Sequence, residues 1–180
     1  RPSLRASCFR VAAATDVLVV GGGPAGLLAA ETIAATGASV VLVERNRERG
    51  IGVFGSNVTI EGSIVRDTDA RELDALLGGG VSAQVDEVTK TPSVLVVRAT
   101  VVERSRQGGI TVVGSKATID STVVRDTLPR VRDNKFGRGI NADGDMTTKR
   151  AAELVLRRVI VERNRDGGVV VFGSKADIEA

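Results

Sequence analysis

The chain has 180 residues, of which 25 are basic and 22 acidic, for a formal charge of +3. This small and evenly mixed charge, with only four phenylalanines as aromatic residues, does not fit nucleic-acid binding. The absence of histidine removes imidazole catalysis and the commonest transition-metal ligand, so we expect no metal site. The one cysteine, Cys8, excludes an internal disulfide, and no apolar run is long enough to span a membrane.

Three segments are expected along the chain: an N-terminal tail at 1–15, a β-α-β unit at 16–44, and a repeated region at 43–180. The chain begins at Arg1 and stops inside a repeat at Ala180, so we expect it to be a fragment. The compartment stays open, because a fragment need not carry its targeting signal.

Residues 16–44 read DVLVVGGGPAGLLAAETIAATGASVVLVE. The apolar run at 17–20 predicts a buried strand, and the Ala/Leu-rich stretch at 24–36 predicts the main helix of the chain. A second apolar run at 40–43 predicts another strand, which ends in Glu44. This order of strand, helix and strand is typical of a dinucleotide-binding unit.

The glycines at the end of the first strand have the spacing G-x-G-x-x-G. Gly21 permits the tight turn, Gly23 lets the backbone approach a pyrophosphate, and Gly26 allows the helix to pack closely on the strand. The amides at the start of the helix would face the phosphates. Glu44 stands where an acid accepts hydrogen bonds from a ribose hydroxyl.

The wording GGGPAGLLAA followed by VVLVER resembles FAD-dependent oxidoreductases with a Rossmann-type domain. The resemblance covers about residues 15–45 and implies FAD as the cofactor. The residues that it places at the cofactor are Gly21, Gly23, Pro24, Ala25, Gly26, Glu44 and Arg45. Past Arg45 the resemblance fails, because polar residues precede Gly144-Asp145 where the family has an apolar strand, and no catalytic residue can be named.

A second pattern recurs in steps of 59 residues: VERNRERGIGVFGS from Val43, VERSRQGGITVVGS from Val102 and VERNRDGGVVVFGS from Val161. IVRDT at 64–68 and VVRDT at 123–127 add two weaker copies, in which Val65 and Val124 correspond to Val43, Val102 and Val161, so that the spacings alternate between 22 and 37 residues. A spacing of 22 fits three short strands and their turns, and the longer spacing fits an insertion such as 128–149.

We therefore predict a mainly β fold, a right-handed parallel β-helix of about five coils, two with long insertions, preceded by the β-α-β unit. The residues expected to point inward in the first coil are Ile51, Val53, Val58, Ile60 and Ile64, with Val53, Val112 and Val171 in one column. Two sets of glycines are expected at turns with positive φ: Gly50, Gly109 and Gly168, and Gly55, Gly114 and Gly173. The helix is expected to cover the open end of the solenoid, and a sandwich of ordinary hairpins is the alternative.

Residues 43–180 resemble bacterial right-handed parallel β-helix repeat proteins, many of which are secreted or attached to a surface. This resemblance implies an architecture, with functions that range from carbohydrate cleavage to passive scaffolding. The shortage of aromatic residues argues against a sugar-binding groove. The recurring Arg-Asp pairs at 66–67 and 125–126 are interpreted as solvated turns.

Two functional hypotheses remain at this point. The first is a chimera-like scaffold or surface-binding segment, joined to an ADP/FAD-binding motif without a complete catalytic site. The second is an FAD-dependent oxidoreductase represented by its ADP-binding opener. A dinucleotide is the expected partner in both, and nucleic acid and a membrane span are not expected. The two resemblances imply different compartments, so the localisation remains open.

Overall fold

The computed structural model describes residues 17–20, 40–44 and 46–179, and this part of the chain forms strands that all pair in parallel. The six-stranded sheet contains, in spatial order, β1 (Val17–Val20), β2 (Val40–Glu44), β5 (Ser63–Arg66), β8 (Val101–Glu103), β11 (Val123–Arg125) and β14 (Ile160–Glu162). One five-stranded sheet contains β3 (Arg49–Phe54), β6 (Gly79–Gln84), β9 (Gly108–Val113), β12 (Arg138–Asp143) and β15 (Val169–Phe172). The other contains β4 (Asn57–Glu61), β7 (Val94–Arg98), β10 (Lys116–Asp120), β13 (Glu153–Arg157) and β16 (Lys175–Glu179).

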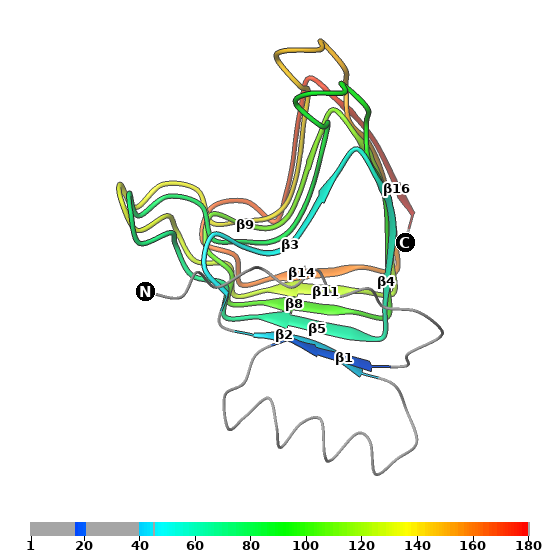
Figure 1. Ribbon diagram of the computed structural model, residues 1–180. Helices are drawn as coiled ribbons and strands as arrows, with labels where there is room; N and C mark the ends of the chain where they lie inside the picture. The colour runs from blue at the N-terminus through cyan, green and yellow to red at the C-terminus, as the bar shows by residue number, and fades with distance from the viewer. Residues whose placement is uncertain (1–16, 21–39, 45, 180) are drawn as a thin grey trace, which may run out of the picture.

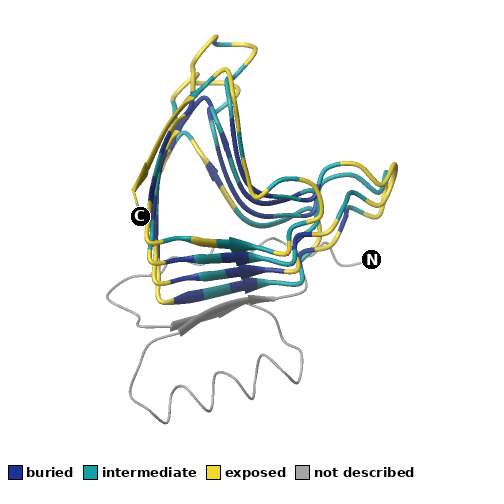
Figure 2. Ribbon diagram, turned by 180° about the vertical axis from the view of Figure 1, so that it is seen from behind, coloured by how far each residue is buried: buried dark blue, intermediate teal, exposed yellow. Residues whose placement is uncertain are grey.

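From β2 onward the chain passes through the three sheets in turn, and each strand pairs with the strand three elements further along. The sheets surround a shared interior, while long loops project where the chain crosses from one sheet to the next (Figure 1). One apolar cluster, with members from all three sheets, fills this interior. Burial is concentrated on the inner faces of the middle strands, and the loops and the last strands are exposed (Figure 2).

This architecture corrects the predicted fold class. We predicted a right-handed parallel β-helix with a separate β-α-β unit ahead of it. The structure instead has three all-parallel sheets, with no helix among residues 17–20, 40–44 and 46–179. The strands β1 and β2 belong to the same six-stranded sheet as β5, β8, β11 and β14. These two strands therefore do not form a separate unit. The supported description is a mainly β protein with the all-parallel pairing that is also typical of α/β proteins.

The alignment of the five valines predicted from the 22- and 37-residue spacings is confirmed. These valines are register partners across the six-stranded sheet, in the order Val43, Val65, Val102, Val124 and Val161. The three in the middle of this column are fully buried. Stacking valine on valine in neighbouring strands keeps the branched side chains in contact on the pleated surface.

The predicted inward face of the first strands is confirmed in part. Val53 and Ile60 are buried, and the predicted residues at 51 and 58 are partly buried against the core. The prediction for Ile64 is wrong, because β5 buries Ser63 and Val65 instead. One residue, Gly62, separates β4 from β5. The even-numbered residues point inward in β4, whereas the odd-numbered residues point inward in β5.

The recurring glycines prove to have two different roles. Gly55, Gly114 and Gly173 have the predicted positive φ, at 57°, 56° and 58°. Gly50, Gly109 and Gly168 do not, so the prediction for this set is wrong. Gly109 lies in β9, where a Cβ would come within 2.6 Å of the carbonyl oxygen of Gly139 on the next strand. Glycine is needed there because two backbones approach closely.

The segment 128–149, predicted as a looped insertion, contains a strand of the sheet. Residues 138–143 form β12, and the side chains of Ile140 and Ala142 are buried in the core. Sequence reasoning missed this strand because its outward positions are polar or charged. The predicted helix at 24–36 lies outside the described residues, and the boundaries of the expected 16–44 unit stay a prediction.

The column that contains Val112 provides a test of the core. Val112 is fully buried between Ala83 and Ala142, whereas Val171, which follows Ala142 in the same column, is 38% exposed. We expect Val112→Asp to lower the free energy of unfolding by more than about 3 kcal/mol, because it buries an unpaired charge. The matched control Val171→Asp should cost less than about 1 kcal/mol. Chemical denaturation checks both values, and equal costs for the two variants would contradict this register.

Candidate functional site

Seven residues were predicted to contact a dinucleotide, and the structure describes the backbone of one of them, Glu44, at the end of β2. The others lie outside the described residues: Gly21, Gly23, Pro24, Ala25, Gly26 and Arg45. The site can therefore be examined through the strands that lead into it.

The strands β1 and β2 pair in parallel, with Val17 beside Val40 and Val20 beside Val43. In the sequence, the glycine motif begins directly after Val20, and Glu44 directly follows Val43. The motif and the acid are thus reached from the same carboxyl edge of two adjacent parallel strands. This is the placement that a dinucleotide-binding unit requires, because the glycines receive the pyrophosphate and the acid receives the ribose beside it. The strand geometry fits an adenine dinucleotide.

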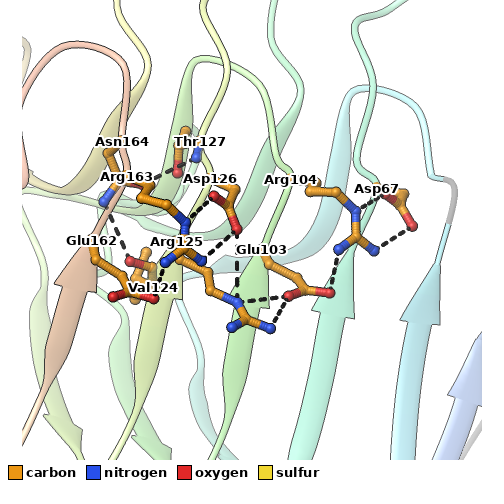
Figure 3. Close-up of polar contacts among 10 residues, drawn as sticks. All are labelled: Asp67, Glu103, Arg104, Val124, Arg125, Asp126, Thr127, Glu162, Arg163 and Asn164. Atoms are coloured by element: carbon orange, nitrogen blue, oxygen red, sulfur yellow. Dashed lines mark hydrogen bonds and ion pairs between the residues drawn. The ribbon is translucent and has the colours of Figure 1, made fainter.

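Glu44 also begins a line of alternating charge along the carboxyl edge of the six-stranded sheet. The residues in register across this sheet are Glu44, Arg66, Glu103, Arg125 and Glu162. We call this line the charge ladder. A second line of opposite phase follows one residue later, with Asp67, Arg104, Asp126 and Arg163, and Figure 3 shows the contacts between the two lines.

Glu103 lies at the centre of the ladder and is almost completely buried. Its carboxylate accepts hydrogen bonds from Nη1 of Arg104 at 2.6 Å and from Nε of Arg125 at 2.8 Å. Oppositely charged residues on adjacent strands stabilise a sheet, and a buried carboxylate needs such partners. Glu103 therefore has a structural role.

The second line is held by paired hydrogen bonds between strands. Arg104 donates from Nε and Nη2 to both carboxylate oxygens of Asp67, at 2.6 and 3.1 Å, and Arg163 makes the same contacts with Asp126, at 2.7 and 3.1 Å. The hydrogen bond from Arg163 is the main reason why the pKa of Asp126 is lowered from its ordinary value. Both acids are paired with arginine in two-point contacts, so they are poor candidates for acid–base catalysis. Asp67 and Asp126 directly follow β5 and β11 with positive φ and partly exposed side chains, which agrees with their interpretation as solvated turns, and the ion pairs with arginine add to it.

Several hollows on the described surface have the size of a ligand site. One of them is a cleft of about 350 Å³ between the loops that follow β6 and β12, and Asp86, Glu87 and Asp145 lie in its wall. Asp86 and Asp145 accept hydrogen bonds from the backbone amides of Thr89 and Thr148, which helps to lower the pKa of each acid. Carboxylates in this wall would repel a pyrophosphate, so the cleft does not compete with the β1–β2 edge as a dinucleotide site.

Comparison with known proteins supports a cofactor for the first part of the chain. Residues 14–60 match the family model described as an FAD binding domain. FAD is therefore the cofactor that this part of the chain supports. The matched segment begins just before β1 and continues through β4, so it includes the glycine motif, Glu44 and the first strand of each five-stranded sheet.

Curated relatives match a stretch of similar length. A thiamine thiazole synthase of Solidesulfovibrio magneticus is 39% identical over 59 residues, which is 33% of this chain and 22% of that protein. Thiamine thiazole synthases of Desulfosudis oleivorans and Aeropyrum pernix are 41% and 42% identical over 61 and 62 residues, 34% of this chain and 24% and 23% of those proteins. The chain thus spans less than a quarter of the length of these relatives, and no solved structure matches it.

The comparisons give no support to a chimera-like scaffold, and the dinucleotide is the one predicted partner that they support. In the part of the chain that the structure describes, no acidic or cysteine side chains gather as a metal site requires. None of the described residues belongs to a long apolar helix of the kind that crosses a bilayer.

The structural role of the charge ladder can be tested by comparing Glu103 with Glu162, because the two residues occupy equivalent positions on β8 and β14. Glu162 makes its one ion pair within the described residues to Arg163, at 2.6 Å, and its side chain is 42% exposed. We expect Glu103→Gln to lower the free energy of unfolding by about 2 kcal/mol, because two arginines lose a buried partner. Glu162→Gln should cost less than about 1 kcal/mol. Urea denaturation measures both, and a cost for Glu103→Gln no larger than for Glu162→Gln would contradict the structural role of the ladder.

Proposed function

We propose that this chain carries the ADP-binding opener of an FAD-dependent oxidoreductase. The observation that supports the proposal is the parallel pairing of β1 with β2, because in the sequence the glycine motif directly follows β1 and Glu44 ends β2. The match of residues 14–60 to an FAD binding domain supports it independently.

In this proposal the backbone of Gly21, Gly23 and Gly26 receives the pyrophosphate, and the residues between them, Pro24 and Ala25, complete the loop. Glycine is required because a side chain would occupy the space of the phosphates. Backbone amides at the end of a strand and the start of a helix provide the hydrogen bonds without a competing charge. When bound, the isoalloxazine ring of FAD would supply the redox chemistry.

Glu44 is the proposed acceptor for the hydroxyls of the adenosine ribose, and Arg45 follows it in the sequence. Arg66 is the register neighbour of Glu44 in β5. An arginine in register with an acid is the arrangement that recurs at the other positions of the ladder.

The proposed function comprises FAD binding and membership in the oxidoreductase class of enzymes, and it names no reaction. The reaction of the thiamine thiazole synthases is not part of it, because the chain spans less than a quarter of those proteins. The second candidate is a purely structural role for Glu44, and one specific observation favours it. Glu103, in the same column as Glu44, is a structural ladder residue without any glycine motif beside it, so Glu44 could be structural too.

Titration of ADP and FAD by calorimetry separates these candidates. We expect weak binding, with a dissociation constant of about 1 to 100 micromolar, because the part of the chain described here offers no second half of a flavin site. Gly23→Val should abolish binding, since the new side chain would stand where the pyrophosphate lies. Glu44→Ala should weaken binding about tenfold through loss of the hydrogen bonds to the ribose.

The matched control is Glu162→Ala, which removes the equivalent acid of the ladder at a strand without a glycine motif. This variant should bind ADP as the unaltered chain does. Equal heats for the unaltered chain and Glu44→Ala, or no binding to either, would mean that Glu44 has only the structural role of its column.

A further inference from the structure

Five polar residues form a column at the corner where the chain leaves the six-stranded sheet. They are Asn46, Thr68, Ser105, Thr127 and Asn164, each three residues after a member of the valine column. The carbonyl oxygen of each of the first four accepts a hydrogen bond from the amide that follows its neighbour in the column, at 2.8 to 3.1 Å. We call this line the polar column.

The middle of the polar column is buried, and its side chains lack hydrogen bonds. Thr68, Ser105 and Thr127 are each at most 1% exposed. The hydroxyl groups of all three have no hydrogen-bond partner within the described part of the chain. A buried hydroxyl without a partner is costly, and nearly all such groups in proteins bond to the protein or to ordered water. The polar column therefore calls for a partner that the chain itself does not supply.

Asn164 shows how the polar column is satisfied where it carries a longer side chain. The Oδ1 atom of Asn164 accepts a hydrogen bond from the amide of Thr127 at 3.1 Å, and its Nδ2 donates to the carbonyl oxygen of Val124 at 3.3 Å (Figure 3). The carboxamide thus links the chain after β14 to the end of β11.

Ser105 is the counterpart of Asn164, 59 residues earlier in the sequence. By the same step, the groups that correspond to the partners of Asn164 are the amide of Thr68 and the carbonyl oxygen of Val65. Ser105 makes neither contact, because its hydroxyl has no partner.

The backbone around the two positions is alike. A Cβ on Gly80 would come within 2.5 Å of Oγ of Ser105, and a Cβ on Gly139 would come within 2.6 Å of Nδ2 of Asn164. Serine lacks two of the atoms that fill this corner at Asn164, so the shorter side chain leaves space for about one water molecule.

We propose that the polar column binds a buried water molecule between Ser105 and the end of β5. The water accepts a hydrogen bond from the amide of Thr68, donates one to the carbonyl oxygen of Val65, and pairs with the hydroxyl of Ser105. Three such contacts are typical of a buried water. In this way the water replaces the carboxamide that Asn164 supplies one unit later.

The proposed water lies beneath a segment that holds the preceding loop in place. Ser105 stands between Arg104, which binds Asp67, and Arg106, which binds Asp69 with an Nε–Oδ1 distance of 2.6 Å. A bridging water contributes nearly as much as a direct hydrogen bond. Hydration of Ser105 thus fixes the backbone from which both arginines reach the loop after β5.

Water-selective NMR on the isotope-labelled full chain tests the site directly. We expect a rotating-frame Overhauser contact between water and the amide of Thr68, and none at the amide of Thr127, which Asn164 already binds. In Ser105→Asn the contact at Thr68 should disappear, because the carboxamide takes the place of the water. No contact in the unaltered chain would overturn the proposal. So would a contact that persists in Ser105→Asn, since it would be relayed by an exchanging threonine hydroxyl.

The reciprocal variant Asn164→Ser is the matched control, and it decides the question even if Ser105→Asn does not fold. It should create the same site one unit later, so that a water contact appears at the amide of Thr127. A Thr127 amide that stays without a water contact in this variant would contradict the proposal.

Stability measurements separate a hydrated corner from a dry one. Ser105→Asn should raise the urea midpoint by about 0.5 M, because two hydrogen bonds to the backbone replace the bound water. Ser105→Val should lower it, because the valine displaces the water and leaves the amide of Thr68 and the carbonyl of Val65 without a partner. A higher midpoint for Ser105→Val would mean that the space is apolar and dry, which would overturn the proposal.

Discussion

The in-register parallel pairing of strands that lie 22 or 37 residues apart is the constraint on which the rest of the structure depends. Side chains alternate between the two faces of a strand, so the register of a strand determines the neighbours of its buried residues and of its exposed residues together. The register that places Val124 beside Val102 in the core also places Arg125 beside Glu103 at the carboxyl edge, where the two form an ion pair. A slip of one residue would expose the valine and separate this ion pair. The charges at the strand ends therefore oppose slippage of the core.

Alternation between neighbouring strands explains why the pattern repeats after 59 residues although strands pair at 22 and 37. In one column Val112 lies between Ala83 and Ala142, a large side chain between two small ones. In the six-stranded sheet Glu103 lies between Arg66 and Arg125. Two consecutive strands of this sheet thus form one unit that is complementary in charge, because identical neighbours would bring acid against acid.

The pairing of the strands could be predicted from the sequence. Which side chains of each strand are buried, and where two backbones come close, could not. The valine column was predictable because identical residues recur at fixed spacings. The burial of Val65 in place of Ile64 was not, because it depends on how many residues the preceding turn uses. The role of Gly109 depends on the carbonyl of Gly139, which lies on another strand, and the fold class depends on β1 and β2 joining the large sheet. The ladder was visible as recurring acids and arginines, and the overlooked signal was their alternation in sign at successive strands.

At the β1–β2 edge the ladder reaches Glu44, the last residue of β2, and in the sequence the glycine motif directly follows the neighbouring strand β1. The most direct test is an NMR titration of the isotope-labelled chain with FAD. We predict that amide shifts will concentrate at residues 20–26 and 43–46 and at Arg66, and that amides near Glu103 and Glu162 will not move. Shifts centred on the loops around Asp86 and Asp145, or no shifts at all, would contradict an FAD site at the edge of β1 and β2.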